Sequence, residues 1–204
     1  MRAERPAPGE ELNTGDVVTP REAATLMLLR DGEEGLEVLM VQRNPTQRFM
    51  GGMWVFPGGA FRDGDADPLA TAVRELEEEA GIQLEQPDAP AFSRWITPAE
   101  LKIRFDTWFF VAAAPEGAQV RIDGNECVDA RWLGPAVALA ACERGELELP
   151  FPTYKHLEQL QAHDSAAAVL EAARGRTVEP VQPSLSGTPE APEVLLPDDP
   201  GHQA

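Results

Sequence analysis

The chain is poor in cysteine, in basic residues and in histidine, and each shortage excludes a class of protein. Its two cysteines, Cys127 and Cys142, form no C-x-x-C pair and no disulfide framework, which is typical of a protein in a reducing cytoplasm. Only 17 Lys and Arg stand against 35 Asp and Glu, so the net charge of −18 argues against sequence-independent binding of nucleic acid. The three histidines lack the spacing of metal ligands, and we assign them no role.

Long apolar runs are missing as well. No stretch approaches the roughly 20 apolar residues that cross a bilayer, and residues 1–15 lack the apolar segment of a secretory signal. We therefore expect a cytoplasmic protein that binds neither a membrane nor a nucleic acid. Because the chain is acidic, an anionic substrate must be met by local cations, either metal ions or arginines.

What the chain does contain suits one globular domain with two polar extensions. Its 204 residues are 43% hydrophobic, which is enough for a core. Residues 1–18 are polar and are predicted to be a flexible tail. The domain is predicted over residues 19–174. Residues 175–204 are rich in proline and are predicted to be mostly extended or disordered, with a short strand at 193–197.

Apolar patterns predict a mixed sheet with helices packed on it. Two apolar runs joined by D-G-E-E-G are predicted to form a hairpin. Further strands are expected before and after a long helix, and two more helices follow them. The expected strands are 23–30, 36–43, 54–56, 94–98, 104–115 and 127–134, and the C-terminal helices are 135–145 and 152–175. This order indicates the α/β class, in an α+β form with a mixed sheet.

The long helix is predicted over residues 67–81 and presents acids on one face. Asp67 can cap it, Pro68 fits its first turn, and Gly81 can end it in a left-handed conformation. One stripe of the helix is apolar and faces a core; it consists of Leu69, Ala72, Val73, Leu76 and Ala80. The carboxylates that share a second face beside this stripe are those of Glu75, Glu78 and Glu79.

Three carboxylates on one helix face need a physical reason. Each close pair costs roughly 0.2–0.5 kcal/mol in an isolated helix, and a hard divalent cation removes that cost. Oxygen ligands in this number suit Mg²⁺ or Mn²⁺. A solvated acidic face is the ordinary alternative, but the acids are asymmetric about the helix and follow a turn at residues 56–59, whose glycines let backbone approach a ligand. Arg74, four residues before Glu78, can orient or partly neutralise one acid.

Residues 58–82 resemble the Nudix box, G-x5-E-x7-R-E-U-x-E-E-x-G-U, in which U is aliphatic. Gly59 matches the first glycine, and residues 74–82 match the whole second half. Asp65 stands where the box has Glu, and eight residues instead of seven separate it from Arg74. The additional residue precedes the helix, where a loop can absorb it, so the role of Asp65 is left open.

This resemblance implies a fold, a metal site and a reaction. Nudix domains are α/β/α sandwiches in which the box forms a loop–helix–loop. Their box acids bind divalent ions, which shield a diphosphate and make water acidic enough to attack phosphorus. The implied substrate is a nucleoside diphosphate linked to another moiety, and many Nudix proteins are homodimers. Carried over to this chain, the ligands are Glu75, Glu78, Glu79 and the carbonyl of Gly59, and Arg74 holds one acid in place.

A further acid is expected from the loop before a strand. Many Nudix enzymes draw a metal ligand or a general base from such a place, and Glu126 in N-E-C-V-D-A-R-W-L-G is our candidate. Asp123 and Asp129 are rivals, and an arbitrary surface glutamate is the alternative. With Glu78 and Glu79, Glu126 is a candidate for removing the proton of the attacking water.

The segment before the box carries a second resemblance, to coenzyme A diphosphatases. Their motif is L-L-T-x-R-[SA]-x3-R-x3-G-x3-F-P-G-G, in which Val41 replaces the Thr and Asn44 replaces Ser or Ala. The positions that match are Arg43, Arg48, Gly52 and residues 56–59. Two arginines near a metal site can bind the phosphates of a polyanion, although they can also pair with the many acids of the chain. We therefore favour coenzyme A or an acyl derivative as the substrate.

Other functions stay open. The substrate of a Nudix enzyme can equally be ADP-ribose, an NDP-sugar, NADH or an oxidised nucleotide. A protein of another class, a non-catalytic nucleotide sensor on the same fold, is the second alternative, although such sensors often lose box acids that are all present here. Several aromatic residues could stack an adenine, but at strand spacing they are more often core; they are Trp95, Phe105, Trp108, Phe109, Phe110 and Trp132.

Overall fold

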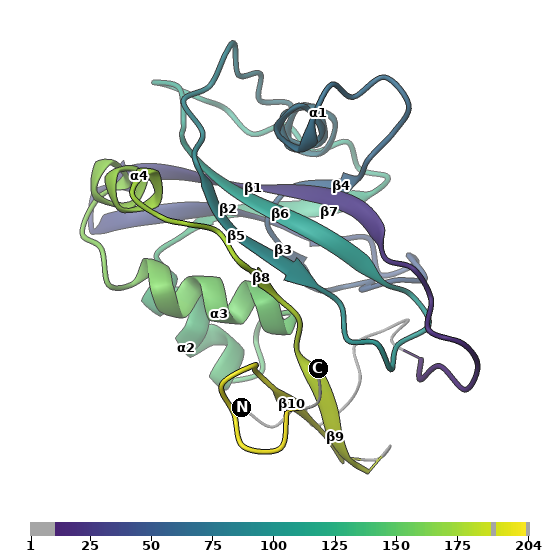
Figure 1. Ribbon diagram of the computed structural model, residues 1–204. Coiled ribbons are helices and arrows are strands. Elements are labelled where there is room, and N and C mark those ends of the chain that lie inside the picture. Colours follow the sequence, from purple (N-terminus) through teal and green to yellow (C-terminus); the bar gives the residue numbers. More distant parts are fainter. Residues whose placement is uncertain (1–10, 189–190, 203–204) are drawn as a thin grey trace.

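The computed structural model describes residues 11–188 and 191–202, which build a β-sheet between two layers of helices (Figure 1). The strands of the sheet are β1 (Arg21–Gly32), β2 (Gly35–Arg43), β3 (Trp54–Val55), β4 (Gly58–Ala60), β5 (Ala91–Ile96), β6 (Phe105–Ala113), β7 (Cys127–Leu133) and β8 (Pro180–Val181). The helices are α1 (Pro68–Ala80), α2 (Pro135–Glu143), α3 (Phe151–Leu160) and α4 (Ala166–Arg174). Two further strands, β9 (Ser184–Thr188) and β10 (Ala191–Leu195), form a separate hairpin.

The sheet is mixed, as the element order predicts. Its strands are hydrogen-bonded in the order β3-β2-β1-β6-β5-β8, while β4 pairs with β1 and β7 pairs with β2. β1 runs antiparallel to β2, which confirms the predicted hairpin, and parallel to β6. Residues 29–32 of β1 pair with β2, whereas residues 23–25 pair with β4. The glycine turn of the box therefore enters the sheet as a short strand where β2 has diverged from β1.

Both faces of the sheet are covered, as the uninterrupted apolar run in β1 indicates. Leu26 and Leu28 pack with α1 on one face, whereas Met27 and Leu29 pack with α2, α3 and α4 on the other. All four side chains are fully buried. The chain is thus an α/β/α sandwich, and the predicted fold class is confirmed.

The single helix expected over residues 152–175 is wrong, because the structure has two helices there. α3 ends at Leu160, and α4 begins after Ser165, whose Oγ accepts a hydrogen bond from a backbone N–H of the second helix. The Asp31 carboxylate, from β1, accepts another at 2.8 Å from the Ala166 N–H. These two side chains satisfy N–H groups that have no partner at the start of a helix, so they stabilise a new helix start.

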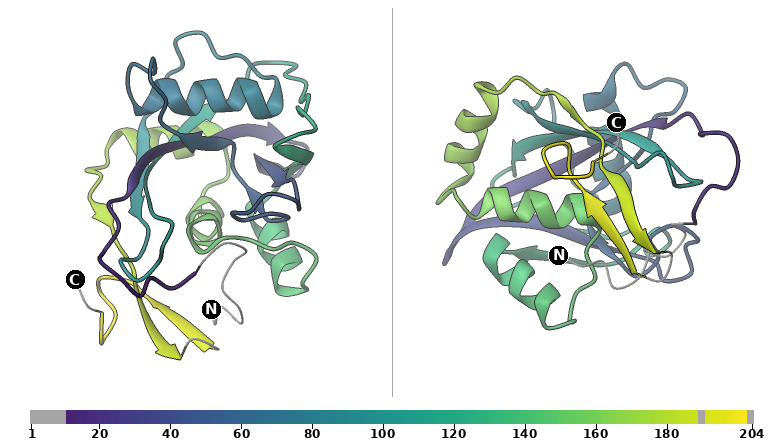
Figure 2. Two further views of the ribbon diagram at one scale, coloured as in Figure 1. Left: turned by 90° about the vertical axis from the view of Figure 1, so that its right-hand side faces the viewer. Right: turned by 60° about the horizontal axis from the view of Figure 1, so that its bottom comes forward.

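The polar extensions are more closely attached to the domain than their composition indicates. Residues 1–10 of the predicted tail lie outside the described part, and Leu12 pairs with Leu101. At the other end β8 joins the sheet beside β5, and the strand expected at 193–197 is present two residues earlier as β10 (Figure 2). The domain boundaries stay a prediction. Within the described residues, each helix is too short or too polar to cross a membrane.

Candidate active site

Helix α1 presents the box acids in a fixed orientation because both of its ends are capped. The Asp67 carboxylate accepts a 2.8 Å hydrogen bond from the Ala70 N–H, and Pro68 occupies the first turn. Gly81 follows the last turn with φ 66°, and its N–H donates to the Glu77 carbonyl at 2.9 Å. Both caps match the sequence prediction, and they determine where the helix begins and ends.

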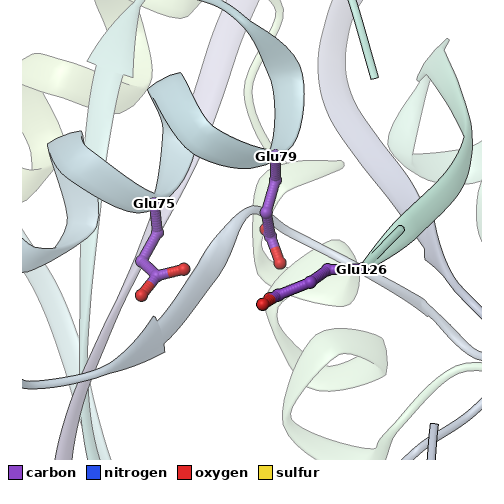
Figure 3. A group of neighbouring side chains, drawn as sticks. All are labelled: Glu75, Glu79 and Glu126. Atoms are coloured by element: carbon purple, nitrogen blue, oxygen red, sulfur yellow. The ribbon is translucent and has the colours of Figure 1, made fainter. Parts of the chain in front are cut away.

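Three carboxylates meet between α1 and the loop before β7, namely those of Glu75, Glu79 and Glu126 (Figure 3). Each offers one oxygen, and these oxygens lie within 4.8 Å of one another. Glu75 and Glu79 are each only 2% exposed, while Glu126 is at the surface. Carboxylates this close repel one another when they are ionised, the more so when they are buried. The group therefore fits a divalent ion such as Mg²⁺ or Mn²⁺.

Glu79 supports this fit by an unpartnered oxygen. Its Oε2 accepts a 3.0 Å hydrogen bond from the Gly58 N–H, but its buried Oε1 has no hydrogen-bond partner among the described residues. The Arg43 guanidinium lies 4.0 Å from that oxygen. Burial raises the pKa of Glu79 to about 7, although the Gly58 N–H and Arg43 oppose the rise. A buried carboxylate oxygen beside two other acids is suited to coordinate a cation.

Glu75 lies directly against β4. A Cβ on Gly59 would stand 2.5 Å from the Glu75 carboxylate, so a larger residue there would displace that carboxylate from its observed position. Burial raises the pKa of Glu75, and Arg74, which donates to its Oε1 at 2.7 Å, opposes that rise. The first glycine of the box is thus next to the acids, while its carbonyl as a metal ligand stays a prediction.

Asp65, whose role the sequence leaves open, holds Arg74. Nε and Nη2 of Arg74 donate to the two oxygens of Asp65 at 2.9 Å each, and the Thr71 hydroxyl donates to the same carboxylate. The Arg74 guanidinium keeps the pKa of Asp65 well below its usual range. Arg74 also reaches Glu75 at 2.7 Å and Glu78 at 3.2 Å. The loop therefore accommodates the additional residue of the box, and Asp65 still pairs with Arg74.

Glu78 does not belong to the group of three. Its side chain is 43% exposed, and Arg62 Nη1 donates to both of its oxygens at 2.9 Å. Arg62 Nη2 also lies 3.5 Å from Glu75. Glu78 as a ligand therefore stays a prediction. The sequence analysis did not identify Arg62, because no periodic pattern in the box loop indicates which side chains turn toward the helix. The available signal was that a basic residue lies inside that loop.

The loop before β7 places Glu126 beside the helix acids. Partial burial alone would raise the pKa of Asp123, but the N–H groups of residues 125–127 donate to its carboxylate at 2.8–3.0 Å and lower it. The Asn44 N–H, at the end of β2, donates to the Glu126 carbonyl at 2.8 Å. Asp129 pairs with an arginine two residues later. Of the three rival acids, only Glu126 lies in the carboxylate group.

The two arginines of the coenzyme A-like segment differ in position. Arg43 ends β2, lines the cavity described below, and donates through Nε to the Phe49 carbonyl at 3.3 Å. Arg48 is exposed and is absent from the described lining of that cavity. The structure therefore brings one of the two predicted substrate-binding residues to the acids and leaves the other outside.

The carboxylates lie at one end of a cavity of about 1670 Å³. Glu75 and Glu126 line this end, whereas the β9–β10 hairpin and the start of α3 line the other. Of the six aromatic residues considered for base stacking, Trp95, Phe105 and Phe109 line the cavity, and the remaining three do not. The cavity is thus large enough to hold more than the group that reacts.

The fold and the acid group together define a domain of the Nudix type. A family model described as the NUDIX domain matches residues 19–152, well over half of the chain. The chain belongs to this family.

Particular relatives resemble parts of the chain. The "Putative 8-oxo-dGTP diphosphatase 3" of Mycobacterium tuberculosis (strain ATCC 25618 / H37Rv) is 31% identical over 114 residues, 54% of this chain and 51% of the relative. The "Uncharacterized Nudix hydrolase NudL" of Klebsiella aerogenes is 43% identical over 63 residues, 30% of this chain and 51% of the relative. The chain thus spans about half the length of these curated relatives. A crystal structure of a NUDIX hydrolase from Alicyclobacillus acidocaldarius superposes with a TM-score of 0.70 and 27% identity, covering 76% of this chain and 96% of that one.

Proposed function

We propose that the protein hydrolyses the diphosphate bond of a nucleoside diphosphate linked to another moiety, with Mg²⁺ or Mn²⁺ as cofactor. The observation that carries this proposal is the meeting of Glu75, Glu79 and Glu126 within 4.8 Å at one end of a large cavity. Acid oxygens in this number suit a hard divalent ion, and the cavity offers the substrate a place beside them. Membership of the NUDIX family supports the same conclusion.

The acids of the site would hold the ion. Glu75, Glu79 and Glu126 are the proposed ligands, and Glu78 and the Gly59 carbonyl are proposed additions to them. When bound, the ion shields the negative charge of the diphosphate and lowers the pKa of water. Hydrogen bonds from Arg74 to Glu75 and from the Gly58 N–H to Glu79 hold the two buried acids, and so fix the position of this charge relative to the cavity wall.

The proposed reaction is a displacement at phosphorus. A water oxygen forms a bond to one phosphorus, and the bond from that phosphorus to the bridging oxygen breaks. The bridging oxygen leaves with the other phosphate. Glu78, Glu79 or Glu126 accepts the proton that water loses. Arg43, 4.0 Å from Glu79, is the residue that we propose contacts a phosphate of the substrate.

Within this reaction class, coenzyme A or an acyl-coenzyme A is the substrate that we propose. The coenzyme A-like segment brings Arg43 to the cavity, and the cavity has room for more than a nucleotide. The products would be adenosine 3′,5′-bisphosphate and phosphopantetheine or its acyl form. Because Arg48 is exposed outside the cavity, we assign it only to parts of the substrate that project from the opening.

An oxidised nucleotide is the second candidate substrate. It is favoured by the relative named a putative 8-oxo-dGTP diphosphatase, which is 31% identical over 114 residues. That substrate is smaller than coenzyme A and would leave the hairpin end of the cavity unfilled. ADP-ribose, an NDP-sugar and NADH belong to the same reaction class and are included in the test.

A turnover panel with Mg²⁺ and with Mn²⁺ tests the substrate. The panel holds coenzyme A, acetyl-coenzyme A, 8-oxo-dGTP, ADP-ribose, NADH and a UDP-sugar, with products identified by mass. We expect coenzyme A species to lead by about tenfold or more in kcat/KM, which is ~1.4 kcal/mol of transition-state binding. If another compound leads, the coenzyme A-like segment does not select the substrate. If nothing turns over with either metal, the non-catalytic sensor becomes the favoured function.

A matched pair of variants on α1 tests the role of Glu78 in turnover. Glu78→Gln is expected to abolish turnover while the melting temperature changes little, because this side chain is exposed and the fold does not depend on its charge. Glu77→Gln is the control, since Glu77 precedes it on the same helix and lies outside the acid group. Full activity of Glu78→Gln would remove Glu78 from both the ligand and the base assignments.

A further inference from the structure

The cavity extends well beyond the carboxylates. Ligand pockets usually hold about 300–1,000 Å³, and this one holds about 1670 Å³. A nucleoside diphosphate beside the acids therefore leaves a large part of it unfilled. We call the unfilled part the distal end. Three segments line it: the β9–β10 hairpin, residues 147–151, which lead into α3, and the turn at residues 98–101. The hairpin lies on the same side of the sheet as α2 and α3 (Figures 1 and 2).

Apolar side chains form part of the wall of the distal end. Leu185 in β9 and Val194 in β10 are opposite one another in the hairpin, and both line the cavity. Leu101, Leu149 and Phe151 line the same end from the turn and from the start of α3. Leu101 and Leu149 are buried, and the other three are half-buried. An apolar surface enclosed on several sides gains free energy by binding an apolar group.

The distribution of charge assigns the two ends to different parts of a ligand. Among the described residues that line the cavity, the cations beside the acids are Arg43 and Arg62. The third lining cation, Arg21, lies over the Phe105 ring near the 98–101 turn, where acids such as Glu100 and Glu148 outnumber it. Phosphates are therefore attracted to the end where Arg43 and Arg62 lie and where the acids would hold a cation, and the distal end takes an uncharged group.

The hairpin is held in place by specific contacts. The Leu185 N–H donates to the Glu100 carboxylate at 3.1 Å, so the hairpin and the 98–101 turn are joined directly. Val181, just before the hairpin, pairs with Trp95 in the sheet. His202 contacts the Gln182 carbonyl at 2.9 Å. All of these contacts involve residues after 152, so the hairpin side of the wall lies beyond the part of the chain that the family model matches.

We propose that the distal end is a subsite for an extended apolar group joined to the diphosphate, of the chemical class of an acyl-pantetheine, and that Leu185 and Val194 limit the length of that group. The identity of the group rests on the proposed function, because a diphosphate cleaved at the acids places its second substituent along the cavity. The subsite itself rests on the apolar wall and on the distribution of charge.

Binding of acyl-pantetheines that lack phosphate tests the subsite without turnover. Butanoyl-, octanoyl- and dodecanoyl-pantetheine are titrated into the full chain by calorimetry. We expect affinity to rise by about fourfold for each added methylene until the distal end is full. Val194→Asp is expected to weaken octanoyl-pantetheine binding at least about tenfold, because it places a charge in the apolar wall.

Leu195→Asp is the matched control, since Leu195 is the next residue of β10 and does not line the cavity. It should leave binding within about twofold of the original protein. Val194→Trp, which fills space without adding charge, should shift the preference toward shorter chains and keeps the test usable if the aspartate variant melts early. Affinity independent of chain length, or equal losses in the two aspartate variants, would overturn the subsite.

The proposed function and the subsite can fail separately. If coenzyme A species are not hydrolysed but acyl-pantetheine binding depends on chain length and on Val194, the subsite stands and the substrate assignment is wrong. If coenzyme A species are hydrolysed at equal rates whatever the chain, and acyl-pantetheine binding ignores Val194→Asp, the reaction stands and the subsite is wrong.

Discussion

Arg62 and Arg74, two of the guanidinium groups beside the acids of α1, are held in different ways. Arg74 is 23% exposed and is fixed by the two-oxygen pair with Asp65. The Arg62 side chain is half-exposed, and the contacts found for it among the described residues are with Glu75 and Glu78. Arg74 therefore belongs to the framework of the site, whereas Arg62 can turn into solvent or toward a substrate phosphate when a cation replaces it.

Replacing Arg62 is expected to strengthen metal binding. In Arg62→Gln the acids lose a neighbouring positive charge that competes with the ion, so the dissociation constant for Mn²⁺ should fall about three- to fivefold, the size of an exposed ion-pair contribution. Titration of Mn²⁺, followed by electron paramagnetic resonance of the free ion, measures this directly. Arg144→Gln is the control, because Arg144 pairs with Glu146 on the surface. Weaker binding in Arg62→Gln would mean that Arg62 orders the acids instead of competing with the ion.

Helical spacing was enough to predict that Glu75, Glu78 and Glu79 share a face, but it did not reveal which of them come together. Glu75 and Glu79 are a full turn apart and meet Glu126, while Glu78 turns toward Arg62. The choice depends on the path of the 61–67 loop and of the loop before β7. Both paths are set by contacts between distant residues, which a local pattern does not contain.

At the scale of elements, the start of α4 depends on two side chains from different parts of the chain. Ser165 caps the helix from within the segment, and Asp31 caps it from β1. The sequence analysis merged α3 and α4 because the polar residues 161–165 resemble the exposed face of a continuous helix. A capping serine was visible there, but the contribution of Asp31 arises only from the fold.

Removing the local cap should destabilise the protein without affecting catalysis. Ser165→Ala is expected to lower the free energy of unfolding by about 1 kcal/mol, because one N–H at the helix start loses its partner. Urea unfolding should show a lower midpoint with an unchanged slope. Turnover should be unaffected, since none of the described residues of α4 lines the cavity.

Ser165→Asp is the matched variant for this prediction, because aspartate keeps an oxygen in the capping position. It should retain most of the stability that Ser165→Ala loses. A loss of equal size in both variants would show that the hydroxyl acts through packing and not as a cap.

At the scale of the whole molecule, the two ends of the described chain meet at one turn. The Asn13 N–H donates to the Glu100 carbonyl, and the Leu185 N–H donates to the Glu100 carboxylate. Composition alone predicted polar, loosely attached segments at both ends. The apolar residues Leu12, Leu185 and Val194 are too few to predict attachment, and they become effective only because the turn brings them to one cavity.

The core between the sheet and helices α2, α3 and α4 contains an uncharged histidine that links α3 to the sheet. His156 is fully buried, its Nε2 lies 2.6 Å from the Ser93 hydroxyl, and its ring is 4.3 Å from that of Phe109 between centroids. Burial lowers its pKa from 6.5 to about 3. The sequence analysis gave this histidine no role, and the structure places it in packing, away from the acids.

This histidine should make the fold sensitive to mild acid. Its folded-state pKa lies below its unfolded-state value, so between about pH 6.5 and pH 3 the unfolded chain binds the additional proton. The stabilisation from the neutral ring is complete above pH 6.5 and is lost as the pH falls, by up to about 1.4 kcal/mol per pH unit.

The double variant His156→Leu with Ser93→Ala removes the titrating group and the hydroxyl that would otherwise lose its partner. Denaturant unfolding from about pH 7 to pH 5 should show the free-energy difference between the original protein and this variant changing with that slope, because the carboxylates common to both cancel. A difference that stays constant with pH for the double variant would mean that folding does not lower the pKa of His156.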